Sequence, residues 1–200
     1  MASRIDDLLE RIVALEREID AEFESLRAGW RYRIEKGRVR FEREVRDAHR
    51  KLRRSIPRYL RESQILSVVT APVIYSMVVP IAILDLWVTV YQALCFRAYG
   101  MTRVRRSAYI VIDRHHLAYL NGIEKLNCVY CGYANGVFAY VREVAGRTEQ
   151  YWCPIRHARR VHAPHTHYRE FVDYGDAQGY QRRLIRLRKE LADEPSARDH

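Results

Sequence analysis

The chain has 200 residues, a formal net charge of +10 and a pI near 9.7. This length suits one modest domain with accessory elements and excludes several large domains. The charge indicates an acidic partner: anionic lipid is the first candidate, and nucleic acid is disfavoured because no recognised binding motif is present.

Residues 2–28 predict a long amphipathic helix. Ser3 followed by Asp6 and Asp7 suits its beginning, because a hydroxyl and early acids complement the positive end of a helix. Charges fill the positions between apolar residues at heptad-like steps, namely Ile5, Leu8, Ile12, Leu15, Ile19 and Leu26. This pattern is compatible either with a coiled coil that joins copies into a homo-oligomer through residues 5–26, or with packing on the same chain.

Residues 27–61 carry fourteen Lys and Arg against four acids, a balance of +10 that equals the net charge of the whole chain. Apolar residues recur at steps of three and four, so the segment predicts a basic amphipathic helix on a membrane surface. Each basic side chain near anionic lipid contributes about 1 kcal/mol. The side chains nearest the following apolar stretch are Arg50, Lys51, Arg53, Arg54, Arg58 and Arg61. Residues 1–63 are therefore interpreted as a charged helical arm.

Residues 64–97 predict a membrane-embedded helical segment. No charge occurs between Ile65 and Leu84, and twenty helical residues match a hydrocarbon core of roughly 30 Å. The stretch lies mid-chain, which argues against a cleaved signal peptide. A central helix buried in protein is the least favoured alternative.

Two topologies remain open for this segment, a single span and a re-entrant bend. Pro72 and Pro80 each bend a helix, and Asp85 at mid-bilayer would cost roughly 2.5–3.5 kcal/mol. Both flanks are basic, which favours placing both on the cytoplasmic face of a membrane. We expect Asp85 to be a helix-turn or interface residue rather than a functional acid.

Residues 98–175 predict a small α+β domain. Residues 107–113 are rich in β-formers and predict a short strand. Residues 117–126 are either helical or turn at Asn121-Gly122, and residues 137–145 predict a helix that Gly146 ends. Residues 176–200 predict a basic amphipathic helix with a loose end beyond Pro195. The fold class is therefore mainly α, with this small domain appended.

Two cysteine motifs indicate a metal site. Cys128 and Cys131 form a C-x2-C-G-Y motif that predicts a tight turn, and Cys153 begins a C-x3-H motif that ends at His157. Three sulfurs and one nitrogen form a closed tetrahedral site that suits zinc. Three clustered thiols cannot all form internal disulfides, which favours a reducing compartment. Alternative fourth ligands are His162, His165 and His167, with His115 and His116 as further candidates.

Residues 128–157 resemble the metal knuckles of the rubredoxin and zinc-ribbon families. Cys128 to Tyr133 match the first knuckle, and Trp152, Cys153 and Pro154 resemble the second. Arg156 stands where those families carry a fourth cysteine, and His157 follows it. The resemblance implies metal binding, with zinc favoured over iron because a Cys3His set disfavours a reversible iron couple. The alternative is that the three cysteines are packed free thiols.

The predicted function is a non-catalytic binding or scaffold module at a membrane surface, with a structural zinc site and an unknown protein partner. No Ser-His-Asp pattern or phosphate-cradling glycine loop is present. Three alternatives remain: a metal-dependent nuclease whose residues 113–116 and 127–131 resemble the HNH order, a monotopic lipid-modifying enzyme around Asp85, and a rubredoxin-like redox protein.

Overall fold

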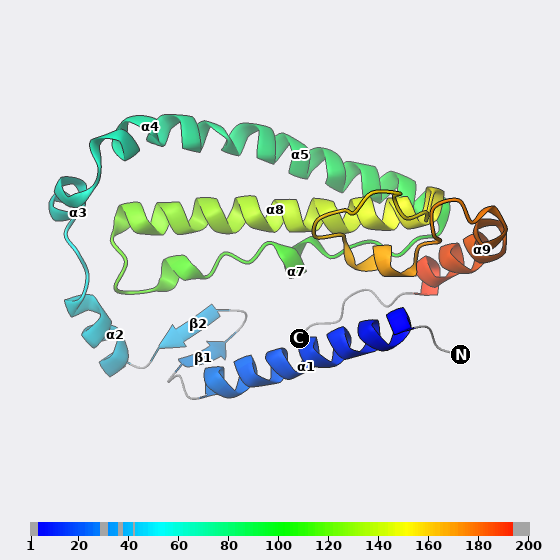
Figure 1. The fold of residues 1–200 in the computed structure, drawn as a ribbon. Coiled ribbons are helices and arrows are strands. Elements are labelled where there is room, and N and C mark those ends of the chain that lie inside the picture. Colours follow the sequence, from blue (N-terminus) through cyan, green and yellow to red (C-terminus); the bar gives the residue numbers. More distant parts are fainter. Residues whose placement is uncertain (1–3, 29–31, 36–37, 42, 194–200) are drawn as a thin grey trace. The chain divides into compact units, whose positions relative to one another are not determined.

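The computed structural model describes residues 4–28, 32–35, 38–41 and 43–193 and is mainly helical (Figure 1). The chain divides into two compact units. The first contains residues 1–54 and 116–119, and the second contains residues 55–115 and 120–200.

In the first unit, α1 (Arg4–Ala28) confirms the predicted N-terminal helix. Most of its heptad-like apolar side chains are exposed, namely Leu8, Ile12, Leu15, Ile19 and Leu26. Ser3 lies outside the described residues, and nothing is described of the Ile5 side chain. Self-association through residues 5–26 stays a prediction.

The prediction of one amphipathic helix over residues 27–61 is wrong. Strands β1 (Tyr32–Glu35) and β2 (Arg38–Phe41) form an antiparallel hairpin in which Tyr32 pairs with Phe41 and Glu35 with Arg38. Both short runs alternate apolar and charged residues, and this period of two favours strands. Two separate helices follow, α2 (Arg43–Lys51) and α3 (Ile56–Glu62). Extended Ser55 precedes α3, and Pro57 in its first turn suits a helix start.

The apolar stretch confirms the prediction of one long helical segment. Ile65–Tyr99 is a nearly continuous helix of 35 residues, long and apolar enough to cross a membrane. It consists of α4 (Ile65–Ser76), α5 (Val78–Tyr91), a π-helical turn η1 (Gln92–Phe96) and α6 (Arg97–Tyr99). Its interruption lies at Met77, because Pro80 lacks the N–H that would bond the Ser76 carbonyl and its ring crowds that oxygen. We call Ile65–Tyr99 the apolar helix.

The chain then reverses at Gly100, whose φ of +68° suits glycine. Residues 100–115, here called the return segment, run back along the apolar helix with only two short helical turns, α7 (Arg106–Tyr109) and the start of η2 (Arg114–His116). After the reversal, α8 (Gly122–Trp152) runs in the same direction as α5 (Figure 1). Successive contacts of Tyr75 with Asn127 and of Tyr91 with Thr148 show this parallel arrangement.

Three predictions for residues 107–146 are wrong. Residues 107–113 are not a strand, residues 128–133 are not a tight turn, and Gly146 does not end a helix. A capping box begins α8: the Asn121 side chain accepts from the N–H groups of Ile123 and Glu124, and the Glu124 carboxylate accepts from the Asn121 N–H. This box satisfies three backbone donors that a helix start would otherwise leave unbonded.

The glycines of α8 allow other segments to approach its backbone. A Cβ at Gly136 would lie 2.8 Å from both the Ile110 Cα and the Tyr109 carbonyl oxygen, and one at Gly132 would lie 3.3 Å from the Val111 oxygen. The return segment therefore rests directly on α8. Glycine at these positions leaves room for the close approach of the return segment, although glycine in a local sequence usually indicates a turn.

The hydrophobic core joins the end of the apolar helix, the start of the return segment, α8 and the C-terminal helix. Helix α9 (Ala177–Asp193) confirms the predicted C-terminal helix, whereas Pro195 and the end beyond it lie outside the described residues. A loop with one helical turn, η3 (Thr166–Glu170), connects α8 to α9. The main buried cluster contains Phe96, Met101, Val104, Tyr140, Val144 and Leu191. Over the described residues, the predicted α+β metal-binding domain is replaced by this helical packing.

Candidate functional site

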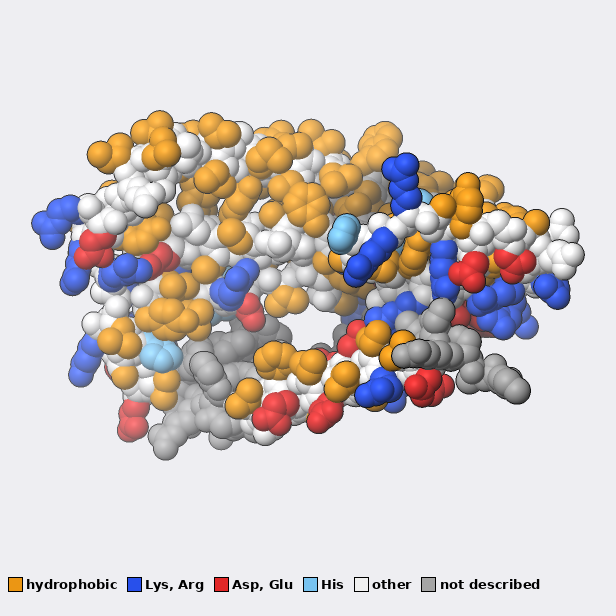
Figure 2. Space-filling view, viewed as in Figure 1, with side chains coloured by type: hydrophobic (Ala, Val, Ile, Leu, Met, Phe, Trp, Pro, Cys, Tyr) orange, Lys and Arg blue, Asp and Glu red, His pale blue; other side chains and the backbone are white. Residues whose placement is uncertain are grey.

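One side of the apolar helix exposes a continuous row of large apolar side chains. They recur at helical steps and are between 44 and 73% exposed. We define this outer face as Leu66, Val69, Val73, Met77, Ile83, Leu86, Trp87, Val90 and Leu94. Figure 2 shows apolar side chains gathered along α4 and α5. A soluble monomer rarely exposes so long an apolar surface, so this face marks an interaction site.

The opposite side of the apolar helix carries its only acid. Asp85 is 6% exposed, and both of its oxygens bond Arg106 of the return segment, Nε at 2.8 Å and Nη2 at 2.5 Å. The Tyr133 hydroxyl of α8 donates to the same carboxylate at 2.9 Å. Burial and this hydrogen bond raise the pKa of Tyr133 above its ordinary value, which favours the protonated hydroxyl that donates to Asp85. Asp85 therefore joins three segments, and we call this triad the Asp85 lock.

A second polar contact fixes the start of the return segment. The Gln92 side chain accepts from the Val104 N–H at 3.0 Å and donates to the Val104 carbonyl at 3.2 Å, and it also bonds the Tyr140 hydroxyl. Gln92 is the first residue of the π-helical turn, and turns of this kind are frequent at functional sites. The Gln92 side-chain amide thus bonds both backbone groups of Val104, as the backbone of a neighbouring strand would.

The predicted metal ligands are not brought together. Cys128 and Cys131 lie on one face of α8, and Cys153 follows its last residue, roughly 33 Å along the axis from Cys131 at 1.5 Å per residue. Among the described residues, no three His, Cys, Asp or Glu side chains lie close enough to hold one metal ion. The zinc and iron predictions therefore have no geometric support in this part of the chain.

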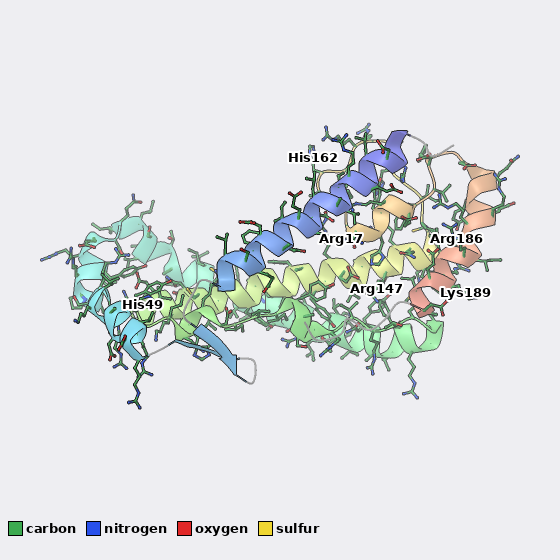
Figure 3. All side chains as sticks on the ribbon, turned by 90° about the horizontal axis from the view of Figure 1, so that it is seen from below. Arg17, His49, Arg147, His162, Arg186 and Lys189 are labelled. Atoms are coloured by element: carbon green, nitrogen blue, oxygen red, sulfur yellow. The ribbon has the colours of Figure 1, made fainter. Side chains whose placement is uncertain are left out.

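Four of the predicted histidine ligands lie on the loop after α8, whereas His115 and His116 lie in η2 before it. The exposed His157 stacks on Tyr168, with ring centroids 6.1 Å apart, and His162 is exposed on the same loop (Figure 3). His165 and His167 instead pair with acids of α8, at 2.9 Å from Glu149 and 3.0 Å from Glu143. These two pairs fasten the loop to the helix.

Glu143 is the acid of one of these two pairs. Its side chain is 12% exposed and also accepts from Arg147 Nε at 2.8 Å (Figure 3). Burial alone would raise the pKa of Glu143, but the hydrogen bonds and charges of His167 and Arg147 outweigh it and lower the pKa from 4.5 to about 2. The ionised form of Glu143 is therefore more stable in the folded protein than in the unfolded chain.

Replacing Glu143 with Gln should remove an acid-sensitive part of the stability. The folded pKa lies below the unfolded one, so this contribution is complete above pH 4.5 and is lost as the pH falls to about 2. We expect Glu143→Gln to lose about 2–3 kcal/mol at pH 7, because Arg147 would remain as an almost buried cation without its acid, and to show a flatter decline between pH 4.5 and 2. Urea unfolding at several pH values measures both effects. Glu190→Gln, from an exposed pair on α9, is the control, and an unchanged acid profile in Glu143→Gln would contradict the assignment.

The predicted lipid-binding basic residues are divided between the two units. Arg50, Lys51, Arg53 and Arg54 belong to the first unit, and Arg58 and Arg61 belong to the second. All six are exposed, and surface ion pairs join Arg50 to Asp47 at 3.7 Å and Arg58 to Glu62 at 2.7 Å. Exposed pairs of this kind contribute little to stability and leave the charge accessible to an anionic surface.

Three comparisons with known proteins return no match. No family model, no curated protein and no solved structure is detectably similar to this chain.

Proposed function

We infer that the protein is a membrane-associated surface module that holds its charged helical parts against a lipid bilayer. The observation that carries this inference is the outer face, an uninterrupted apolar surface along a helix whose single acid points inward to the Asp85 lock. Burying this face in the acyl region removes it from water, at about 25 cal/mol per Å² of apolar area. The exposed basic residues support binding to anionic headgroups.

The packing favours a helix lying in the plane of the interface over a span. A span would carry the attached return segment and α8 into the hydrocarbon, including the irregular backbone of residues 110–113 and the exposed Arg142. Lipid-exposed irregular backbone is not tolerated there, and a charge at the centre costs several kcal/mol. In the planar arrangement only the outer face enters the acyl region, and α8 stays toward the water.

The proposed role is that of a binding platform. Helix α8 packs on the apolar helix, and His165 and His167 hold the following loop against α8. The exposed apolar side chains of α1 can pair with another copy or with a helical partner. In the described residues, Asn127 of the nuclease-like pattern bonds Tyr75 within the helical packing, and Asp85 is held by the lock. These side chains have structural roles here.

Adding charge to the outer face should weaken membrane binding. Ile83→Asp combined with Trp87→Asp places two carboxylates where the proposal puts acyl chains, and we expect roughly tenfold weaker partitioning into vesicles. Flotation with phosphatidylcholine–phosphatidylserine vesicles measures it. Ile185→Asp alters an exposed apolar residue of α9 and should bind like wild type. Equal flotation of all three proteins would contradict the proposal.

The planar and spanning arrangements differ in which flanks a protease can reach. The protein is first bound to the outside of preformed vesicles, and trypsin is then added outside. In the planar arrangement, trypsin should cut both the basic flank before Ile65 and the Arg-rich helix α9. A spanning helix would protect one of these flanks until detergent is added. Mass spectrometry of the released peptides distinguishes the two results.

A further inference from the structure

An apolar groove lies where α3, α4 and the first half of α8 meet. Its volume is about 550 Å³, within the range of small-molecule sites. Leu60, Ala71, Ile74 and Leu126 line its walls, together with residues from each turn of α4. No residue of α4 is fully buried, so the groove separates this helix from tight packing against α8.

The polar groups of the groove are partly occupied by the protein itself. The Tyr75 hydroxyl donates to the Asn127 side chain, and the Ser63 hydroxyl donates to the Tyr59 carbonyl at 2.7 Å. With these hydroxyls used internally, the walls offer chiefly apolar contact. An extended hydrocarbon suits such a lining, whereas a peptide would need partners for its backbone groups.

The groove shares a helix with the outer face. Val68 and Ile74 line the groove and are about half exposed, while Val69 and Val73, one residue away from each, belong to the outer face. The surface of α4 is therefore apolar from the groove wall to the lipid-facing side, interrupted only by small hydroxyl residues. A chain could pass from the bilayer into the groove without crossing a charged rim on this helix.

Positive charge lies at one end of the groove. Helix α3 contributes Tyr59 and Leu60 to the wall, and the same short helix carries the exposed Arg58 and Arg61 against a single acid, Glu62. This excess of cations complements an anionic headgroup.

We propose that this groove binds one acyl chain of an anionic glycerophospholipid, whose headgroup lies toward α3. The proposal rests on the proposed membrane function and names the lipid class that the surface recognises. A protein partner is disfavoured because stable interfaces bury about 800 Å² per partner, and a whole helix is about 10 Å wide. The groove fits a single flexible chain.

Photo-crosslinking tests this assignment in vesicles of phosphatidylcholine and phosphatidylserine. The probe is phosphatidylglycerol with a diazirine in one acyl chain, and the comparison probe has the same chain on phosphatidylcholine. We expect adducts concentrated in residues 59–75 and 123–131, several-fold more with the anionic probe. Ala71→Phe fills the groove and should remove most of them, whereas Val69→Phe, on the outer face of the same helix, should not.

A second variant keeps the test decisive if Ala71→Phe disturbs α4. Leu126→Trp fills the groove from the α8 side and should reduce the same adducts while vesicle flotation is unchanged. Normal flotation with adducts that neither filling variant reduces, or equal labelling by both probes, would overturn the groove assignment alone. Failure of the wild-type protein to float with vesicles would instead overturn the membrane function.

Discussion

Replacing Arg106 with Gln should destabilise the protein by about 2–3 kcal/mol, because Asp85 would remain as a buried carboxylate without its cation. Breaking a fully buried pair costs roughly 3–5 kcal/mol, and the effect is smaller here because the Arg106 side chain is 45% exposed. For a chain of this size we expect the melting temperature to fall by roughly 5–10 °C. Thermal unfolding in mild detergent, followed by circular dichroism, measures the shift.

A double-mutant cycle separates the ion pair from other effects of the substitution. Asp85→Asn in the Arg106→Gln background removes the unpaired charge and keeps an acceptor for Tyr133, so the double variant should be more stable than Arg106→Gln alone. Arg103→Gln, an exposed position of the same return segment, should unfold like wild type. An Arg106→Gln variant as stable as Arg103→Gln would show that the Asp85 lock does not stabilise the fold.

Replacing Gly136 with Val should cost about 3 kcal/mol, since its Cβ would overlap backbone atoms of Tyr109 and Ile110 at 2.8 Å. Backbone cannot rotate away as a flexible side chain can, so the return segment must lift off α8. We expect lower unfolding free energy in urea and faster proteolysis within residues 100–115. Unchanged proteolysis would mean that this segment does not rest on the helix.

Alanine substitutions at three glycines of α8 provide matched controls. Alanine favours a helix over glycine by about 1 kcal/mol, so the sign depends on the space available. At Gly122 the nearest atom is the Ile56 Cδ1 at 3.8 Å, and Gly122→Ala should be neutral or stabilising. Gly132→Ala should be close to neutral, and Gly136→Ala should be destabilising by about 1–2 kcal/mol. A different order would contradict the close approach.

Much of the helical framework follows from local patterns. The heptad-like spacing of Leu8, Ile12 and Leu15 predicts α1, and the charge-free run from Ile65 to Leu84 predicts the apolar helix. In both cases the periodicity or composition extends over many turns, so no distant contact is needed to define the element. Helix α9 follows for the same reason.

The error over Cys128–Tyr133 arises because the same residues fit two structures. C-x2-C-G-Y suits a metal turn, but Cys128 and Cys131 are also neighbours on a helix, and Gly132 suits a helix whose surface another segment touches. The choice depends on the return segment, which is distant in sequence. One local signal did exist, since Asn121 followed three residues later by Glu124 is the pattern of a capping box.

The partners of Asp85 could not be predicted from spacing. Arg106 and Tyr133 lie 21 and 48 residues after it, and neither stands in a motif that points back to the apolar stretch. An acid within so apolar a run indicates that its side of the helix faces protein, but it does not identify the cation. The groove likewise depends on how α3, α4 and α8 meet, which no single segment encodes.

The order of the three lock residues along the chain has a consequence for biosynthesis. A ribosome adding roughly 5–20 residues per second delivers Tyr133 about 2–10 s after Asp85. Arg106 follows Asp85 after about 1–4 s, so the acid first lacks its cation and then, until Tyr133 is made, lacks the helix that later covers its polar side. Until α8 is complete, the newly made apolar helix therefore exposes its polar side as well as its apolar outer face.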